Sequence, residues 1–308
     1  MTEMLQYDFM QRALLAAVIV GVAAPAVGIY LVQRRQAIMG DGIGHVALTG
    51  VALGFLLSTN PVWTAVVVAA LGATAMELIR WYGKTQGDVA LALLFYGGMA
   101  GGVMLVNVSD GGSNANLLTY LFGSITTVAP SDLITIVGLA VVVLGVSLGL
   151  RRQLFSVCQD EEFARVTGLP VRLLNLVLAV TAAITVTVAM RVVGLLLVSA
   201  LMVVPVAAAQ QAARGFAATL GTAMGFGVLV TLSGTTVSYY QDVPPGASIV
   251  LLAIALFALV TAVATPLARR RARRAGAGGG EGEGKDGCDG SESGRDGTGE
   301  RTHIPAQT

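Results

Sequence analysis

The sequence contains few charged residues and very little cysteine or histidine. Asp, Glu, Lys and Arg make up 12% of its 308 residues, whereas soluble domains contain about 25%. Hydrophobic residues make up 55%, and the mean hydropathy is +0.75. This composition excludes an ordinary soluble domain and indicates an integral membrane protein.

The scarcity of charge and of cysteine narrows the possible partners. The net charge is +1, and the basic residues form short patches between apolar segments. A nucleic-acid-binding protein presents a basic face, so we expect no nucleic acid partner. Cys158 and Cys288 lie in segments that we place in the cytoplasm, where disulfides are rare. We interpret both as free thiols without a role.

A nucleotide-binding loop is also missing. The nearest match is GGEGEGKD at 279–286, where Asp286 stands in place of the Ser or Thr that would bind magnesium. No strand precedes this stretch and no helix follows it. The chain is therefore predicted to have no ATPase activity of its own.

Long apolar segments dominate what is present. Each is long enough to cross a bilayer as a helix, and their approximate bounds are 13–33, 43–59, 62–82, 88–107, 132–150, 171–190, 193–211, 216–236 and 247–268. A shorter apolar run at 114–128 leaves counts of eight or ten open. No cleavable signal peptide is evident, because the first run is too long for one. We predict an all-α polytopic membrane protein with about nine transmembrane helices.

The basic residues predict the orientation. Arginines and lysines follow the first, third, fifth, seventh and last segments, and such residues favour the cytoplasmic side. Residues 1–12 then form a short external segment, 13–268 the transmembrane domain, and 151–171 a cytoplasmic loop. Residues 269–308 are a basic stop followed by a glycine-rich tail that is predicted to be disordered in the cytoplasm. Arg191 falls at an outer turn, and we interpret it as reaching the headgroups in preference to forming a gate.

Asp41 and His45 form the most informative pair of ionisable residues. They lie four positions apart in GDGIGHVALTGVALGF, so a helix places both on one face, where they could hold one divalent ion. Ionisable residues within a membrane segment indicate function. A buried, hydrogen-bonded histidine is the competing interpretation, and for an isolated pair the commoner one.

Two further features are polar. Asp242 stands in SYYQDVPPGASIVLL between the last two segments, where it is either an N-terminal cap of the last helix or a ligand. Glu77 and Arg80 are predicted to form an ion pair at a helix end.

Glycines at helical spacing predict close helix packing. Gly221 and Gly225 lie four positions apart and are predicted to pack together against a neighbouring helix.

The cytoplasmic loop QLFSVCQDEEFARVTGLPVRLL combines an acidic cluster with Arg165 and a helix-terminating Gly168. It predicts one short amphipathic helix. Such a helix suits docking to a soluble partner, although a charged connecting loop is the commoner explanation.

Several ordered motifs carry a resemblance to one family. GDGIGHVALTGVALG resembles the GD…SHA…G…LG signature of the permease subunits of ABC importers for zinc, manganese and iron, with Gly44 and Val46 departing from the usual serine and alanine. VTGLPVRLLNLVL, VGLLLVSALMVVPVAAAQ and SYYQDVPPGASIVLL are similar to further segments of that family, with Ala247 in place of the usual proline. Together they cover residues 10–268.

The resemblance implies an importer in the cell membrane. It would contain two copies of this permease as a homodimer, two cytosolic ATPase subunits and an external metal-binding protein. The implied fold is similar to that of the cobalamin and siderophore importer permeases, without their first helix. No cofactor is bound permanently, and the cargo is expected to be Zn²⁺, with Mn²⁺ or Fe²⁺ as alternatives.

The resemblance also assigns residues to roles. The metal path would be lined by Asp41, His45, Asp242 and Ser238, and the ATPase-coupling residues would be Asp160, Glu161, Glu162, Phe163, Arg165 and Gly168. The topology places Asp41 and Asp242 near opposite ends of the bundle, so they can share a site only if helices are broken or short. Gly21, Pro25 and Gly28 could break or shorten the first helix, and Gly40, Gly42, Gly44 and Gly50 could let the second helix start deep in the bundle.

Two other functions fit the polar residues. A secondary transporter or channel for divalent cations, without an ATPase partner, could use Asp41 and Asp242 for ion coupling. An intramembrane zinc hydrolase is disfavoured, because the sequence has no HExxH or similar ligand motif.

Overall fold

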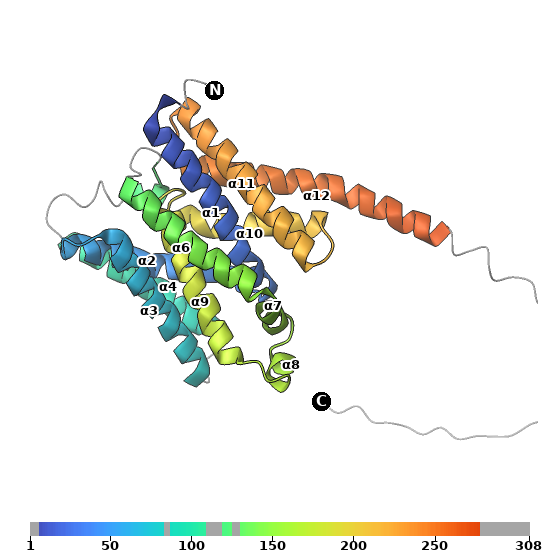
Figure 1. Cartoon of the computed structure of the whole chain (residues 1–308), viewed down its shortest axis with the longest axis horizontal. Coiled ribbons are helices and arrows are strands. Elements are labelled where there is room, and N and C mark those ends of the chain that lie inside the picture. The colour runs from blue at the N-terminus through green and yellow to red at the C-terminus, as the bar shows by residue number, and fades with distance from the viewer. Residues whose placement is uncertain (1–5, 83–86, 109–118, 125–129, 278–308) are drawn as a thin grey trace, which may run out of the picture. The chain divides into compact units, whose positions relative to one another are not determined.

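A computed structural model describes residues 6–82, 87–108, 119–124 and 130–277, with the backbone alone for 87, 88, 106, 131 and 265–277. Every regular element in these ranges is a helix (Figure 1). The chain divides into two compact units, Met1–Thr265 and Pro266–Thr308. The helices are α1 (Asp8–Gln33), α2 (Met39–Leu56), α3 (Pro61–Tyr82), α4 (Gly87–Val108), α6 (Pro130–Gly149), α7 (Arg151–Gln159), α8 (Glu161–Val166), α9 (Val171–Met190), α10 (Leu195–Ala212), α11 (Phe216–Gln241) and α12 (Pro245–Ala277).

The predicted class of an all-α polytopic membrane protein is confirmed. Within the described ranges, eight helices are long and apolar enough to cross a bilayer, and α4 adds a shorter apolar stretch, Val89–Leu105. Each of the nine predicted segments falls on one of these helices. The run at 114–128 is described only at 119–124, and the loop-like stretch at 279–286 lies outside the described residues.

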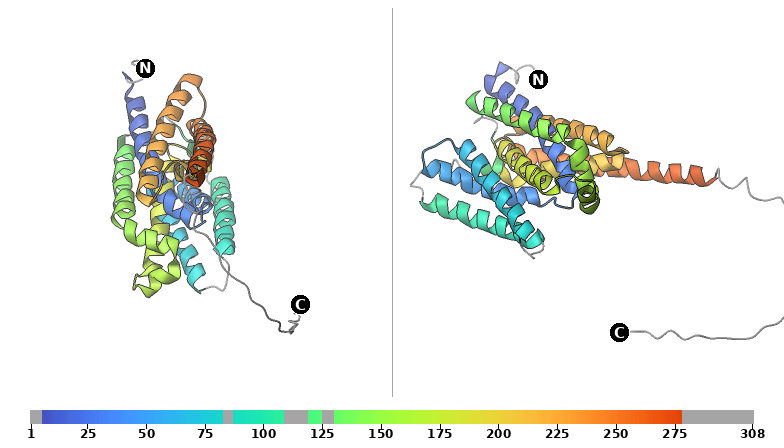
Figure 2. Two further views of the ribbon diagram at one scale, coloured as in Figure 1. Left: turned by 90° about the vertical axis from the view of Figure 1, so that its right-hand side faces the viewer. Right: turned by 60° about the horizontal axis from the view of Figure 1, so that its bottom comes forward.

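Burial separates central from peripheral helices in the first unit. Most of α1 and α9 is buried, whereas less than a quarter of α6 and of the part of α12 up to Ala264 is buried. Helix α2 packs on α3 and α4, while α1 packs on α10, α11 and α6, and α9 contacts members of both groups. Figure 2 shows the same arrangement from two further directions. The exposed apolar faces fit a surrounding of lipid.

Helix α1 is continuous, so the predicted break in it is wrong. Pro25 lies inside the helix, and the two flanking glycines allow neighbouring helices to approach. A Cβ on Gly28 would overlap the carbonyl of Met202 on α10, and a Cβ on Gly227 of α11 would overlap the carbonyl of Gly21. These glycines act as close-packing positions between membrane helices.

The glycine pair predicted to pack on α11 does not do so within this chain. No heavy atom of the described residues lies within 4 Å of the place that a Cβ would take on Gly221 or Gly225. The contact is made instead by Gly227, two residues after Gly225 on the same helix.

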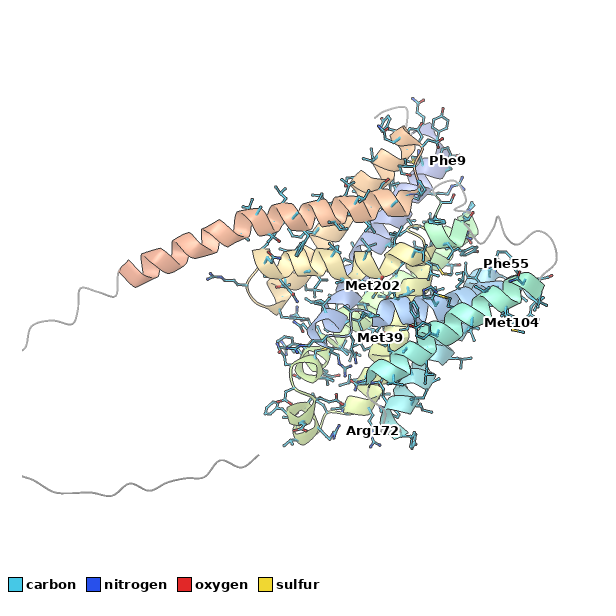
Figure 3. All side chains as sticks on the ribbon, turned by 180° about the vertical axis from the view of Figure 1, so that it is seen from behind. Phe9, Met39, Phe55, Met104, Arg172 and Met202 are labelled. Carbon is cyan, nitrogen blue, oxygen red and sulfur yellow. The ribbon has the colours of Figure 1, made fainter. Side chains whose placement is uncertain are left out.

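Helix α2 begins inside the bundle. Asp41, in its first turn, contacts Ser199, the fifth residue of α10. At about 1.5 Å per residue, the far end of α10 lies about 20 Å further along that helix. Gly40 faces Ser199 and Met202 where α2 and α10 meet, and Figure 3 labels Met39 and Met202 on these two helices. The depth of this start in a bilayer stays a prediction.

Candidate functional site

Asp41 and His45 lie one turn apart on α2, as their spacing predicted. Asp41 is half-buried, and its Oδ1 accepts a hydrogen bond from the Ser199 hydroxyl at 2.7 Å. His45 is 9% exposed, and its Nδ1 has no hydrogen-bond partner among the described residues. A buried polar atom without a partner costs free energy. The interpretation of His45 as a hydrogen-bonded structural histidine does not account for Nδ1.

The rest of the His45 environment is apolar and tightly packed. The ring of Phe95 on α4 lies edge-on to the imidazole, with 4.5 Å between ring centroids. A Cβ on Gly98 would lie 2.8 Å from the carbonyl carbon of His45. At Gly44, a Cβ would lie 2.6 Å from Cδ1 of Leu195, so the serine usual in the resembling family could enter only if that leucine moved.

Ser199 is a site residue that the sequence analysis did not single out. It lies in the apolar run LLLVSALMVVPV, and its hydroxyl is the one polar side chain in those twelve residues. That isolation is a signal for a buried polar contact. Its partner could not be found from sequence, because Asp41 is 158 positions away.

Asp242 and Ser238 lie in a different place from Asp41 and His45. Asp242 is exposed and follows α11 in a left-handed conformation, with φ of 52°. It lines a cavity of about 450 Å³ together with Ser238 and Phe9. Ser238 is buried, and its hydroxyl donates to the carbonyl of Val243 at 2.5 Å. Because α12 begins at Pro245, the interpretation of Asp242 as its N-terminal cap is wrong.

The structure therefore groups the predicted path residues in two places. Asp41 and His45 gather with Ser199 where α2 starts, whereas Asp242 and Ser238 lie at the end of the unbroken α11. Across the described ranges, no three side chains of His, Cys, Asp or Glu lie close enough to hold one ion.

Arg191 is paired, which corrects its interpretation as a residue that reaches the headgroups. Its guanidinium forms an ion pair with Asp132 and donates to the Tyr120 hydroxyl at 2.6 Å. Both charged side chains are 14% exposed. With Phe55 and Asn60, they line a cavity of about 380 Å³.

The predicted single helix of the loop 151–171 is in fact two helices, α7 and α8. Asp160 separates them with an extended backbone, and its Oδ1 accepts from the backbone N–H groups of Glu162 and Phe163 at 2.9 and 3.0 Å. This cap starts α8. After α8, Gly168 adopts φ of 82°, a conformation that glycine adopts readily.

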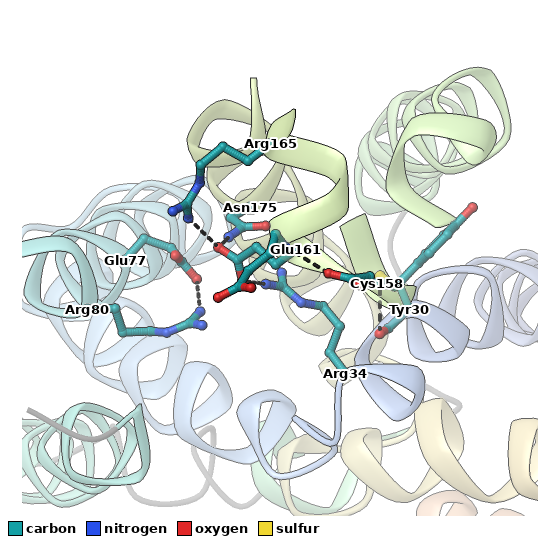
Figure 4. A network of polar contacts seen from close by, with 10 residues as sticks. Tyr30, Arg34, Glu77, Arg80, Cys158, Glu161, Arg165 and Asn175 are labelled. Carbon is teal, nitrogen blue, oxygen red and sulfur yellow. Dashed lines mark hydrogen bonds and ion pairs between the residues drawn. The ribbon is translucent and has the colours of Figure 1, made fainter. Parts of the chain in front are cut away.

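Glu161 connects α8 to the transmembrane helices (Figure 4). Its Oε2 lies 3.5 Å from Nη2 of Arg34, and its Oε1 lies 3.6 Å from Nη2 of Arg165 and 3.4 Å from Nδ2 of Asn175. In the same region the predicted Glu77–Arg80 ion pair is confirmed, at 2.6 Å.

Cys158 on α7 is a free thiol, as predicted. Burial raises its pKa to about 11, although nearby Arg34 acts in the opposite direction. Cys288 lies outside the described residues.

These features together define a polytopic membrane permease with ionisable groups inside the bundle and a polar helix pair at one end. The chain belongs to the ABC 3 transport family, whose model matches residues 6–264. The resemblance to permeases of metal ABC importers is confirmed, and the alternative of a secondary transporter or channel has no support from this membership.

Relatives named for metal transport cover most of the chain. It is 36% identical to a Treponema pallidum protein named as a probable metal transport system membrane protein, over 87% of this chain and all of that one. Identity is 31% with the manganese transport system membrane protein MntC of Halalkalibacterium halodurans, covering 83% and 88%. Identity is 28% with the high-affinity zinc uptake system membrane protein ZnuB of Haemophilus influenzae, covering 82% and 97%.

Two solved structures share the fold. PsaBC from Streptococcus pneumoniae in complex with Fab matches with a TM-score of 0.76 and 30% identity, over 84% of this chain and 92% of that one. An inward-facing ABC transporter of metal-chelate type matches with a TM-score of 0.69 at 15% identity, over 82% and 85%. The second likeness concerns the fold alone and agrees with the fold that the sequence resemblance implied.

Proposed function

We propose that the chain is the permease of an ATP-driven importer that carries a divalent transition metal ion across the cell membrane. It would act as a homodimer with two cytosolic ATPase subunits and an external metal-binding protein, and its C-terminus would be cytoplasmic. The observation that carries the proposal is the buried His45 Nδ1 without a partner, one helical turn from the Asp41 carboxylate.

The chemistry of the pair suits a cargo that must be released. Imidazole nitrogen and carboxylate oxygen both bind Zn²⁺ at about 2.0–2.2 Å. Two ligands from one helix leave further coordination positions to water or to the second copy, so the ion would not be held as in a closed structural site. Asp242 and Ser238 would line an earlier part of the path, nearer the outer face.

Zinc is the cargo that we propose first, as the sequence resemblance predicts. Manganese is the second candidate, because a relative at 31% identity is named for manganese transport. The oxygen atoms of Asp41 and Ser199 also suit Mn²⁺. The same ligand types serve both ions, so selectivity depends on the geometry of the loaded site.

Helix α8 would bind the ATPase. Phe163 is 63% exposed on α8, which is unusual for a large apolar residue in a charged helix and typical of a contact surface. The cap at Asp160 and the left-handed Gly168 fix the two ends of α8, while Glu161, Glu162 and Arg165 supply its charge.

Uptake by the reconstituted importer tests the proposal. The permease, the co-expressed ATPase and the binding protein would be placed in liposomes, and entry of zinc, manganese and ferrous iron would be measured separately and in competition. We expect Asp41→Asn and His45→Ala to lower uptake at least about 10-fold, with the ATPase still co-purifying. His303→Ala removes the only other histidine and serves as the control.

Each part of the proposal can fail separately. Undiminished uptake by the Asp41 and His45 variants would reject the path assignment. Recovery of the wild-type permease without an ATPase subunit would reject the transporter class. A clear preference for manganese in competition would replace zinc as the cargo without affecting either of the other conclusions.

A further inference from the structure

The side chain of Arg34 links two elements that the proposed function uses separately. Arg34 directly follows α1, and its side chain is only 7% exposed. A guanidinium this buried needs an opposite charge nearby. The partner is Glu161, the first residue of α8, at 3.5 Å. A buried cation at the end of one transmembrane helix is thus paired with the helix proposed to contact the ATPase.

The carboxylate of Glu161 is held from more than one side. One oxygen faces Arg34, and the other accepts from Nδ2 of Asn175, the fifth residue of α9. The pair is therefore fixed between α1 and α9, as the labelled side chains in Figure 4 show. Displacement of α8 would pull directly on Arg34.

A compact turn connects Arg34 to the start of α2. Arg35 takes a left-handed conformation, with φ of 58°. The N–H of Gln36 donates to the carbonyl of Leu31 at 2.9 Å, and the N–H of Met39 donates to the carbonyl of Gln36 at 3.0 Å. A turn closed by these hydrogen bonds has little slack. Movement of Arg34 would therefore be passed on to the first residues of α2.

A second contact limits how this turn can move. With its amide oxygen turned toward the guanidinium, Gln36 accepts from both terminal nitrogens of Arg80 at 3.3 Å. Arg80 is also paired with the buried Glu77 on α3. The turn is thus attached to α3 at one point and to α8 at another, and only the second attachment lies on a helix proposed to move.

We infer that Arg34 is a positioning residue that transmits the displacement of α8 to the start of α2, and through it to Asp41 and His45. Asp41 is seven positions after Arg34 and contacts Ser199 on α10. A shift of the α2 start would change the alignment of Asp41 with Ser199 and so the holding of the metal ion. The inference rests on the proposed function, because it takes α8 as the ATPase contact.

Metal imported per ATP hydrolysed is the quantity to measure, in liposomes with the complete importer. We expect Arg34→Gln and Glu161→Gln to lower this ratio at least about 5-fold. Arg34→Gln leaves α8 itself unchanged, so its ATPase recovery should stay within about 2-fold of wild type. The exchanged pair, Arg34→Glu with Glu161→Arg, should recover several-fold over either single variant. Arg172→Gln is the control. It removes an exposed arginine at the start of α9, whose guanidinium lies over the ring of Trp81 on α3.

Arg34→Lys separates an effect on coupling from an effect on folding, because lysine keeps the positive charge. At equal amounts of folded protein, it should import more metal per ATP hydrolysed than Arg34→Gln. A wild-type ratio in Arg34→Gln would overturn the inference. So would an exchanged pair no better than the single variants, or a loss of uptake that only follows loss of bound ATPase. Failure of the proposed function would instead appear in the wild-type protein, as absent metal uptake or an absent ATPase.

Discussion

The hydroxyl of Ser199 donates a hydrogen bond to Oδ1 of Asp41 at 2.7 Å, across 158 positions of the sequence. The contact joins α10 to the first turn of α2, four residues before His45. Helices α2 and α10 approach closely where Gly40 faces Ser199, and this approach brings the side chains of Asp41 and Ser199 together. The orientation of the Asp41 carboxylate therefore depends on a helix distant in sequence.

Replacement of this serine should weaken the binding of the transported ion. Outer-shell partners of ligands contribute about 10–100-fold in metal affinity, so we expect Ser199→Ala to raise the KM for metal uptake about 10-fold. Ser233→Ala is the matched control, because Ser233 is half-buried and its hydroxyl donates only to carbonyls of its own helix, those of Leu229 and Val230. An unchanged KM in Ser199→Ala would show that Asp41 needs no partner on α10.

Substitution by alanine should have different effects on thermal stability at two glycines of α11. A Cβ on Gly227 would overlap the carbonyl oxygen of Gly21, a backbone atom that cannot turn away. Overpacking of this kind costs about 1–3 kcal/mol. Gly227→Ala should therefore lower the thermal unfolding temperature of the purified permease in detergent.

Gly221→Ala serves as the comparison. Its Cβ would enter open space, and alanine favours a helix over glycine by up to about 1 kcal/mol. We expect an unfolding temperature equal to or above that of wild type. Equal losses in both variants would mean that the close crossing of α1 and α11 does not limit stability.

The ion pair between Arg191 and Asp132 should show strong coupling. Both side chains are 14% exposed, and breaking a buried pair from one side costs about 3–5 kcal/mol. Arg191→Gln and Asp132→Asn should each lower the unfolding temperature, and the double variant should lose clearly less than the sum. An additive double-mutant cycle would show that the two charges contribute independently.

The thiol of Cys158 should react slowly with maleimide. Burial raises its pKa from 9.0 to about 11, and the thiolate is the reactive form. At neutral pH the thiolate fraction is then about 100-fold below that of an ordinary thiol. In a chain carrying Cys288→Ser, the labelling rate should keep rising with pH up to about 11, whereas an unfolded chain should react faster and level off near 9. Rapid labelling of the folded chain at neutral pH would contradict this protection.

The local sequence pattern was sufficient to predict several features of the structure. The nine apolar segments all fall on helices, because a helix must satisfy its own backbone within lipid and long apolar runs leave no alternative. The Glu77–Arg80 pair and the common face of Asp41 and His45 follow from helical spacing within one element. In these cases the spacing along one helix determines the geometry, so the sequence was enough to predict it.

Contacts between distant segments could not be predicted. Glycine and proline in α1 suggested a broken helix. In the structure the helix is continuous, and its glycines allow close approach of α10 and α11. Whether a small residue bends its helix or packs against another depends on the neighbouring backbones, which the local sequence does not specify. Arg191 looked solitary because its partner Asp132 is 59 positions earlier.

The sequence by itself determined that this chain is a helical membrane protein, the face of α2 that carries Asp41 and His45, and the family resemblance. Only the tertiary structure decided that Ser199 faces Asp41, that Asp242 lies in another cavity, and that Arg34 holds α8 through Glu161. Spacing along one helix fixes which residues share a face, whereas contacts between helices depend on depth and crossing geometry, which small residues at several separate positions set together.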